Sequence, residues 1–413
     1  MLHLSRCIAP GFLTNGSIGD TLSGFIAFSS TVHDPDTAAA MRRMSARIAH
    51  RGDVESMALF SDRSGVSSRH RAQSGFRVDT HADSRHAAVL DGLVTNLPEL
   101  RRCVGVANET GVAELMLAGH EKFGDAWFEK LDGSFAAWLV DLRTGEVLLV
   151  RDRFGHRPLY FAFARGAVWA ASEIKALLAA PGVAGGLNRT ALPAAIGYGV
   201  TPGPETLFDG IYKCVPGCVF KAFQRGRYES HLYYRPPAPR IFGGTLEESK
   251  ARVWSQLQAT VASYVKECPG VGVLLSGGVD SGLLACQLAE ATGGQAPAIS
   301  FGAAEWGLEE SAEAQKVAEG LGMPFMRAFV RPDDDLAGAL RTVISQLEEP
   351  TRFENAVALA LTYQKVMGSC PAVLTGEGGD STLGDYSHLK ARHLAQVLHQ
   401  PLRSLIAAIW WNR

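Results

Sequence analysis

The segment that most constrains the fold is the hexapeptide Ser-Gly-Gly-Val-Asp-Ser at residues 276–281. The apolar run before it, 271–275, predicts a buried β-strand, and the segment after it, 282–289, predicts a helix. A glycine pair between a parallel strand and a helix lets backbone N–H groups surround an anion, with the positive end of the helix dipole behind them. The segment therefore predicts a phosphate-binding turn, although a glycine-rich turn without a ligand is the alternative when it is taken alone.

Asp280 adds a carboxylate to this turn, and a carboxylate would repel a bare phosphate. A divalent cation between the carboxylate and the phosphates removes the conflict, so the turn predicts Mg²⁺. No Gly-Lys-Ser/Thr follows the glycines, which excludes the phosphate loop of the nucleotide hydrolases.

A second turn of the same kind follows the apolar run 372–374, with the sequence Thr-Gly-Glu-Gly-Gly-Asp at 375–380. Ligands of open parallel sheets bind beyond the carboxyl ends of the strands, where neighbouring loops converge. Two such turns on adjacent strands would bring Asp280 and Asp380 to one magnesium–pyrophosphate group.

The two turns resemble the SGGxDS and SGxGxDE loops of the asparagine synthetase family. The resemblance implies that ATP is cleaved between its α and β phosphates, that AMP is attached to a carboxylate, and that pyrophosphate is released. It implies that Asp280 and Asp380 bind Mg²⁺ and that Glu377 accepts a proton from the attacking amine, although Glu377 as a loop carboxylate stays an alternative. The nucleotide-binding residues that it implies are Leu275, Ser276, Gly277, Gly278, Asp280, Ser281, Phe301, Thr375 and Gly376.

The first half of the chain has a different pattern, with predicted strands in pairs and few helices. This pattern favours layered antiparallel sheets. The predicted strands are 87–90, 135–140, 147–150 and 159–162, with a helix at 36–49 capped by Asp34 or Asp36. Several segments resemble the glutaminase domain of the same family, namely 23–28, 50–53, 131–135, 151–160, 171–178 and 204–211. The resemblance implies an αββα sandwich of the N-terminal-nucleophile-hydrolase type. If the glutaminase is inactive, the charged segment 151–160 is expected to be structural, and a contact between the domains stays open for it.

The departures from that domain predict that glutamine is not hydrolysed. Ser23 stands where the family has an N-terminal cysteine, and the residues before Ser23 leave it without the free α-amino group that would act as base. Asp91 stands where an asparagine would help to bind the oxyanion, and its charge opposes the one that develops there. Ser23, Arg51, Asp91 and Gly92 thus form a degenerate glutaminase site, active only if proteolysis released Ser23 as a new N-terminus.

The chain has 413 residues, enough for two domains with full cores. We expect an N-terminal extension at 1–22, a class II glutamine-amidotransferase-like domain at 23–235, and an ATP-binding domain of the PP-loop ATP-pyrophosphatase type at 236–413. Strands at 271–275, 297–301, 325–330 and 372–375 alternate with helices and predict a parallel sheet. Relatives usually continue through a further helical region, so this domain is expected to lack part of it.

Composition argues against several classes of partner. The net charge of −2 does not favour a nucleic acid, and no run of about eighteen apolar residues predicts a membrane span. Seven scattered cysteines favour free thiols in a reducing cytoplasm. The acidic pairs 309–310 and 348–349 resemble the Asp-Glu-Ser and Asp-Glu-Pro segments of the family, and both helix capping and substrate binding stay open for them.

Loss of the glutaminase leaves three functions open. The chain resembles the glutaminase-deficient branch of the family, the lasso-peptide cyclases and β-lactam synthetases, which implies ring closure within a small-molecule or peptide substrate. For a lasso peptide, the partners would be a precursor peptide and its leader-processing protease. The alternatives are asparagine synthesis from aspartate, and an inactive protein that binds a nucleotide or a partner. The sequence fixes neither the substrate nor the oligomeric state.

Overall fold

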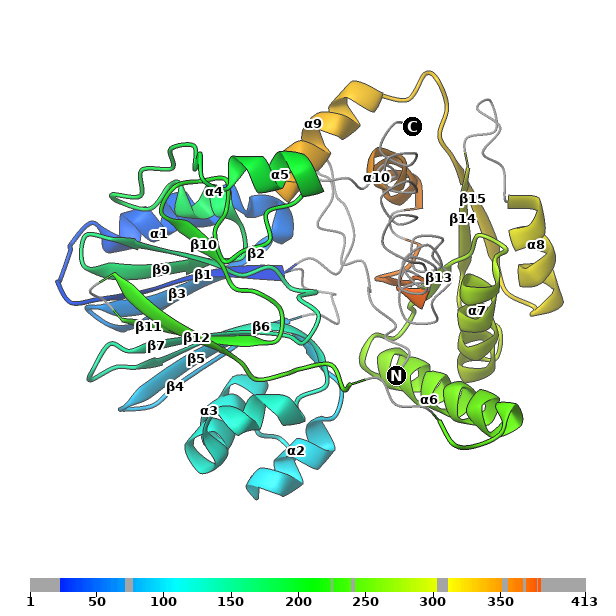
Figure 1. The fold of residues 1–413 in the computed structure, drawn as a ribbon, viewed down its shortest axis with the longest axis horizontal. Coiled ribbons are helices and arrows are strands. Elements are labelled where there is room, and N and C mark those ends of the chain that lie inside the picture. The colour runs from blue at the N-terminus through cyan, green and yellow to red at the C-terminus, as the bar shows by residue number, and fades with distance from the viewer. Residues whose placement is uncertain are drawn as a thin grey trace, which may run out of the picture.

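The computed structural model describes residues 23–70, 77–223, 226–238, 242–302, 311–350, 356–366, 369–376 and 378–379. In these ranges the chain forms a first domain of two stacked β-sheets and a second domain built on a smaller sheet, which lie on the left and right of Figure 1. The chain passes from one to the other after β12, through the segment that precedes α6.

The first domain contains two six-stranded antiparallel sheets. One has the order β10-β8-β9-β1-β3-β2, with β1 Ser23–Ser30, β2 Val54–Ser61, β3 Ser64–His70, β8 Tyr160–Ala164, β9 Ala167–Ala171 and β10 Ile211–Lys213. The other has the order β12-β11-β7-β6-β5-β4, with β4 Arg77–Ala82, β5 His86–Val94, β6 Gly133–Asp141, β7 Val147–Arg151, β11 Cys218–Phe223 and β12 Arg227–Leu232.

Helices cover the outer face of each sheet, which gives four layers (Figure 1). The helices are α1 Thr37–Arg47, α4 Ile174–Leu177 and α5 Leu192–Tyr198 beside the first sheet, and α2 Leu97–Val104 and α3 Val112–Phe123 beside the second. The centre of strand β1 is apolar on both faces, because Phe25 faces the core between the sheets and Ile26 faces the core beneath α1 and α4. The predicted αββα sandwich is confirmed.

The second domain has a four-stranded parallel sheet of order β15-β14-β13-β16. Its elements are α6 Leu246–Glu267, β13 Gly272–Leu274, α7 Val279–Thr292, β14 Ala298–Gly302, α8 Ser311–Gly320, β15 Phe325–Phe329, α9 Leu336–Leu347, α10 Ala356–Val366 and β16 Val373–Leu374. Val273 packs with α6 and α7 on one face, and Leu274 packs with α10 on the other. The predicted alternation of strands and helices around a parallel sheet is confirmed.

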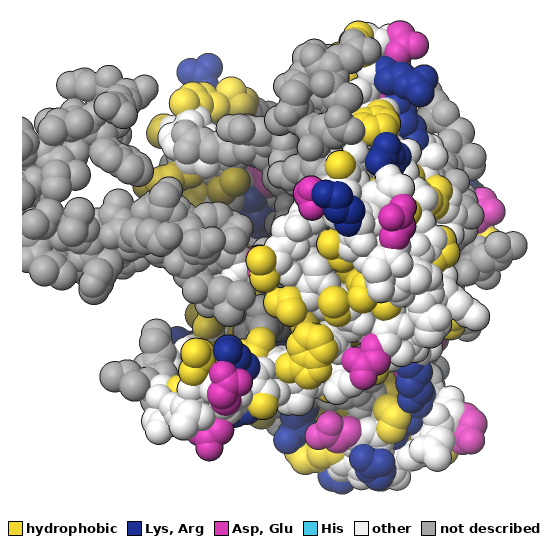
Figure 2. All heavy atoms as spheres, turned by 90° about the vertical axis from the view of Figure 1, so that its right-hand side faces the viewer, with side chains coloured by type: hydrophobic (Ala, Val, Ile, Leu, Met, Phe, Trp, Pro, Cys, Tyr) yellow, Lys and Arg dark blue, Asp and Glu magenta, His cyan; other side chains and the backbone are white. Residues whose placement is uncertain are grey.

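The surface of the second domain carries charges of both signs. On the face that Figure 2 shows, Lys and Arg side chains are interspersed with Asp and Glu. None of the described helices combines the length and the apolarity that crossing a bilayer requires.

Candidate functional site

The two glycine-rich turns leave the same edge of the parallel sheet. Strands β13 and β16 are direct neighbours, with Gly272 opposite Val373 and Val273 opposite Leu374. Since the strands are parallel and in register, the turns that follow them start side by side. Two segments about a hundred residues apart in the sequence therefore lie next to each other, as expected for loops on adjacent parallel strands.

The first turn is held closed by its own hydroxyl groups. The Ser276 Oγ lies 3.0 Å from the Ser281 Oγ, and it accepts a hydrogen bond of 3.2 Å from the Gly278 N–H. Gly277 has a φ of 87°, a left-handed conformation that favours glycine. Gly278 is the N-cap of α7 and has no side chain to cap the helix, so the backbone N–H groups of the first helical turn are suited to an anion.

The second turn lies against Asp280. A Cβ atom on Gly379 would overlap the Asp280 Oδ2, and a Cβ atom on Gly376 would lie 3.2 Å from the Asp280 Cβ. A larger residue at 379 would displace the carboxylate, and one at 376 would crowd the Cβ atom of Asp280. The contact joins the start of α7 to the end of β16, and Thr375 is buried beside it.

Three other predicted site residues have different surroundings. The Leu275 side chain is buried in the core formed with α6 and α7, so only its backbone is left to contact a nucleotide. Phe301, at the end of β14, is half-buried on the opposite face of the sheet. Glu377 and Asp380 lie outside the described residues, so Asp280 is the one member of the predicted metal-binding pair that the structure describes.

The degenerate glutaminase site is a buried hydrogen-bonded cluster in the first domain. The Ser23 Oγ donates to the Asp91 Oδ1, and neither residue is exposed to solvent. The Arg51 Nη1 donates to the Ser23 backbone oxygen at 2.8 Å, and the Arg51 Nε donates to Glu173. Gly92 follows Asp91 on β5, opposite Phe135 of β6. The structure thus brings the four predicted residues together, with the Arg51 guanidinium bound to protein groups.

Glu173 is the centre of this cluster, and the sequence interpretation gave it no role. Its Oε1 lies 2.7 Å from the His50 Nε2, and its Oε2 pairs with the Lys175 Nζ. Burial raises the pKa of Glu173, but the charges of Arg51, His50 and Lys175 outweigh burial and hold the pKa well below its usual range. The available sequence signal is a single acidic residue, with Lys175 two positions further on, in the mostly apolar segment 170–178.

The charges around Arg51 act in the same direction. Burial alone lowers the pKa of Arg51, but the neighbouring carboxylates of Glu173 and Asp91 raise it above its ordinary value. The guanidinium is therefore a permanent cation whose counter-charges are supplied by the protein. Two of the Arg51 donor nitrogens are already bound, Nε by Glu173 and Nη1 by the Ser23 backbone oxygen.

The segment 151–160 has a structural role within the first domain, as predicted. The Arg151 guanidinium donates to the backbone oxygens of Gly155, Arg157 and Cys214, each at 2.7 Å. Asp152 is fully buried and accepts backbone hydrogen bonds from the same loop. These contacts fix the loop between β7 and β8.

The acidic pair at 348–349 faces the first domain. Glu348 accepts hydrogen bonds from the backbone N–H groups of Ile174 and Lys175, each at 2.6 Å. Glu349 forms an ion pair of 2.6 Å with Lys213 and accepts a hydrogen bond from Thr201. Of the two interpretations left open for this pair, the structure supports helix capping, with the cap placed on a helix of the other domain.

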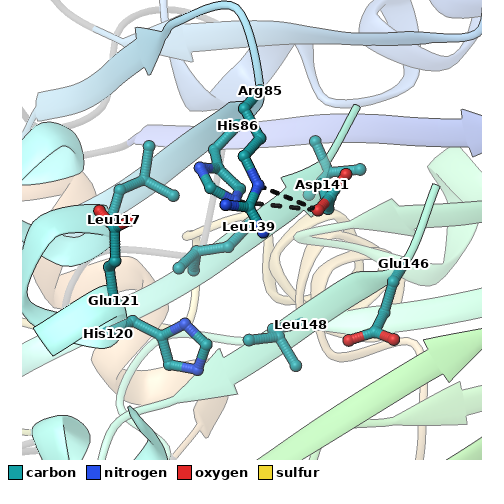
Figure 3. Close-up of a pocket in the computed structure, with 10 residues that line it drawn as sticks. Arg85, His86, Leu117, His120, Glu121, Leu139, Asp141, Glu146 and Leu148 are labelled. Atoms are coloured by element: carbon teal, nitrogen blue, oxygen red, sulfur yellow. Dashed lines mark ion pairs between the residues drawn. The ribbon is translucent and has the colours of Figure 1, made fainter. Parts of the chain in front are cut away.

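A separate cavity of about 340 Å³ lies on the second sheet of the first domain. All ten of the residues drawn around it in Figure 3 come from that domain, and Arg85 and His86 point toward Asp141. The Arg85 Nε lies 3.5 Å and the His86 Nε2 lies 3.9 Å from the Asp141 Oδ2. The cavity contains none of the residues of the two sites described above.

The chain thus consists of an αββα-sandwich domain followed by a parallel-sheet domain in which two glycine-rich turns meet at one edge. Residues 22–234 match the family model of the glutamine amidotransferase domain, and residues 252–409 match that of asparagine synthase. The chain belongs to the asparagine synthetase family.

Similar proteins include a putative glutamine-hydrolysing asparagine synthetase of Mycobacterium tuberculosis, 28% identical over 395 residues. That alignment covers 89% of this chain and 60% of the relative. The glutamine-hydrolysing asparagine synthetase 1 of Bacillus subtilis is 24% identical, with 84% and 56% of the two chains covered. Amidase chry2 of Gibberella zeae is 26% identical, with 69% and 45% covered. The chain therefore spans about 60% or less of the length of these relatives.

Proposed function

We propose that this chain is an ATP-dependent ligase that adenylates a substrate carboxylate for attack by an amine, and that its first domain does not release ammonia from glutamine. The observation that carries the proposal is the contact of Gly376 and Gly379 with Asp280. This contact joins two glycine-rich turns at the carboxyl edge of one parallel sheet.

The residues of the site fit a nucleotide whose phosphates are bound with Mg²⁺. The N-terminus of α7 and the Ser276 and Ser281 hydroxyls supply hydrogen-bond donors, and Asp280 supplies an oxygen ligand of the kind that Mg²⁺ prefers. In this proposal Asp380 is the second metal ligand, and the backbones of Leu275, Phe301 and Thr375 border the nucleotide. When bound, Mg²⁺ neutralises the negative charge that develops on the phosphates.

Glu377 follows Gly376 directly, and we propose it as the base that accepts a proton from the attacking amine. The other groups of the site are hydroxyls, backbone N–H groups and metal-binding carboxylates, which suit binding better than proton transfer.

The state of the first domain supports an amine that does not come from glutamine. The Ser23 hydroxyl is bound to Asp91, which carries negative charge where an oxyanion would need a donor. Loss of one oxyanion donor costs about 10²–10³ in rate, and a carboxylate in its place adds repulsion. Arg51 is bound by Glu173. The nucleophile at residue 23, the oxyanion donor at residue 91 and the cation of Arg51 are therefore all impaired for glutamine hydrolysis.

Among ligase reactions we propose ring closure within one substrate, a macrolactam of the lasso-peptide kind. An amine held on the same molecule as the adenylated carboxylate has a high effective concentration, equivalent to about 7–11 kcal/mol in ideal cases. Such a reaction needs no ammonia, which agrees with the altered glutaminase site. Asparagine synthesis remains a second candidate because relatives bear that name. A protein that binds a nucleotide or a partner without catalysis is the candidate from another class.

The test is ATP–pyrophosphate exchange with candidate carboxylates, namely aspartate and peptides with an internal carboxylate. Asp280→Ala should abolish the exchange, while the matched control Glu247→Gln, on the exposed face of α6, should leave it unchanged. A ring-closing ligase should also convert a peptide to a product lighter by one water. Exchange by Asp280→Ala at the wild-type rate would refute the site, and amide formation only with aspartate would favour asparagine synthesis.

A further inference from the structure

Among the described residues, Glu348 and Glu349 at the end of α9 form an acidic contact between the two domains, with α4, Thr201 and Lys213 of the first domain. The two glutamates lie in the connection between α9 and α10, far in sequence from their partners. Below, this set of residues is called the acidic contact.

Glu348 caps a helix of the other domain. Its two carboxylate oxygens accept one hydrogen bond each from the first N–H groups of α4, at Ile174 and Lys175. The Lys175 Nζ crosses back and donates at 2.8 Å to the backbone oxygen of Ser345 on α9. Glu348 has a φ of 60°, a left-handed conformation that is uncommon for a residue other than glycine. Two sets of contacts hold Glu348 in this conformation. Its carboxylate accepts hydrogen bonds from α4, and Lys175 of α4 donates to Ser345 of α9.

Glu349 makes the second half of the contact. Its Oε2 lies 2.6 Å from the Lys213 Nζ, and its Oε1 accepts from the Thr201 hydroxyl. The Lys213 Nζ also donates at 2.8 Å to the Thr201 backbone oxygen. Both side chains of the ion pair are nearly buried, at 13% and 12% exposed. Removing one partner would leave a buried charge uncompensated, which is far more costly than losing an exposed pair.

The acidic contact continues into the degenerate glutaminase site. Lys175 pairs with Glu173, Glu173 binds Arg51, and Arg51 donates to the backbone oxygen of Ser23. A continuous set of charged contacts therefore runs from the end of α9 to the start of β1. Because Arg51 uses the backbone of residue 23, this set does not require a catalytic side chain there.

The acidic contact holds the connection between α9 and α10. This connection leads to β16 and so to the proposed phosphate site of the second domain. Helices α9 and α10 form the crossover from β15 to β16. Helix α10 packs on β14 and β15, and β16 delivers the turn that meets Asp280. We propose that Glu348 and Glu349 are positioning residues, through which the first domain fixes this crossover and thereby the second phosphate turn. The contact itself stands without the ligase chemistry, and only its effect on nucleotide use rests on the proposed function.

Hydrogen exchange of the full chain tests the contact directly. In Glu349→Gln and Lys213→Met, amide exchange in α9 should rise by at least about tenfold, while β5 and β6 keep their protection. The reversed pair Lys213→Glu with Glu349→Lys should recover most of the protection. Glu247→Gln, which removes an exposed ion pair on α6, is the matched control. Unchanged exchange in α9 for both single variants would overturn the proposal.

Glu348→Ala separates a positioning role from a local cap. Loss of the cap alone would raise exchange only at Ile174 and Lys175, and that result would overturn the proposal. The positioning role predicts faster exchange in α4 and α9 together, and a rise in the KM for ATP in pyrophosphate exchange with little change in kcat. Faster exchange in α9 with an unchanged KM would refute the positioning role and leave the ligase proposal intact. Wild-type protein without any pyrophosphate exchange would refute the ligase and leave the contact intact.

Discussion

Glu348 should make the stability of the protein depend on pH in a way that one substitution removes. Burial raises the pKa of Glu348 to about 7, against the opposing effects of Lys175 and the α4 N–H groups, from an ordinary value of 4.5. Between these two values the folded chain holds a proton that the unfolded chain has released. The free energy of unfolding therefore falls as the pH rises from about 4.5 to 7, and the stabilisation, complete below 4.5, is lost above about 7.

The magnitude follows from the same two values. At 1.36 kcal/mol per pH unit, a rise from 4.5 to about 7 corresponds to about 3 kcal/mol. The Glu348 side chain is only 6% exposed, so solvent screening reduces this figure little. A loss of this size is a substantial part of the stability of an ordinary domain.

Three of the groups whose charges interact with Glu348 keep their charge state in this pH window. The charged and titratable groups that interact with Glu348 are Lys175, Glu173, Arg51 and Tyr160. The pKa of Glu173 is held below its usual range, so it is ionised throughout. The pKa of Arg51 is raised, and burial raises the pKa of Tyr160, so neither changes its charge between pH 5 and 8.

The assay is urea unfolding of the wild type and Glu348→Gln at a series of pH values from 5 to 8, followed by tryptophan fluorescence. The amide cannot ionise, so the difference in unfolding free energy between the two proteins should change by about 3 kcal/mol across the series. Relative to Glu348→Gln, the unfolding free energy of the wild type should fall as the pH rises. A difference that stays constant with pH, or that changes in the opposite direction, would refute the reasoning.

Two further substitutions test the proposed phosphate site and the buried cluster around Glu173. Gly379→Ala should displace the Asp280 carboxylate and lower pyrophosphate exchange by at least about tenfold without unfolding the chain, as circular dichroism would show. An active Gly379→Ala variant would contradict the close approach. Glu173→Gln should leave Arg51 as a buried charge without its main partner and lower the free energy of unfolding by about 3–5 kcal/mol, measured in urea. A loss no greater than that of Glu247→Gln would show that Glu173 is not the main counter-charge.

The sequence predicted the elements of the phosphate site because its signals are local. An apolar run followed by glycines and a hydroxyl marks a strand that ends in a turn, and the strands predicted at 271–275 and 372–375 appear as β13 and β16. The pairing of these two strands, which brings Gly379 to Asp280, depends on tertiary packing, and neither segment alone predicts it. The start of a helix is harder to predict from sequence. Asp36 is the N-cap of α1, but its side chain makes no capping hydrogen bond, and its backbone N–H donates to the Asp34 Oδ1.

The acidic contact could not be predicted, because its partners are far apart in sequence. Glu348 binds a backbone N–H group 174 positions away. Two glutamates before a proline fit the end of any helix, and local patterning does not show which surface they face. The backbone donors at Ile174 and Lys175 have no sequence signature at all. Only the packing of α9 against the first domain turns a common acidic pair into a specific contact.

The contacts around residue 23 also explain why restoring a cysteine there should not restore a glutaminase. Arg51 binds the backbone oxygen of residue 23, so Ser23→Cys should keep the fold and the link to Glu173. Asp91 would then face the thiol, and a negative charge beside a sulfur raises the pKa of the thiol and disfavours the thiolate nucleophile. We expect no glutamate from glutamine in Ser23→Cys or in Ser23→Cys with Asp91→Asn, since neither has a free α-amino group at residue 23. Steady glutamate release by the double variant but not by Ser23→Cys would contradict this expectation and show that Asp91, not the missing α-amino group, keeps the cysteine variant inactive.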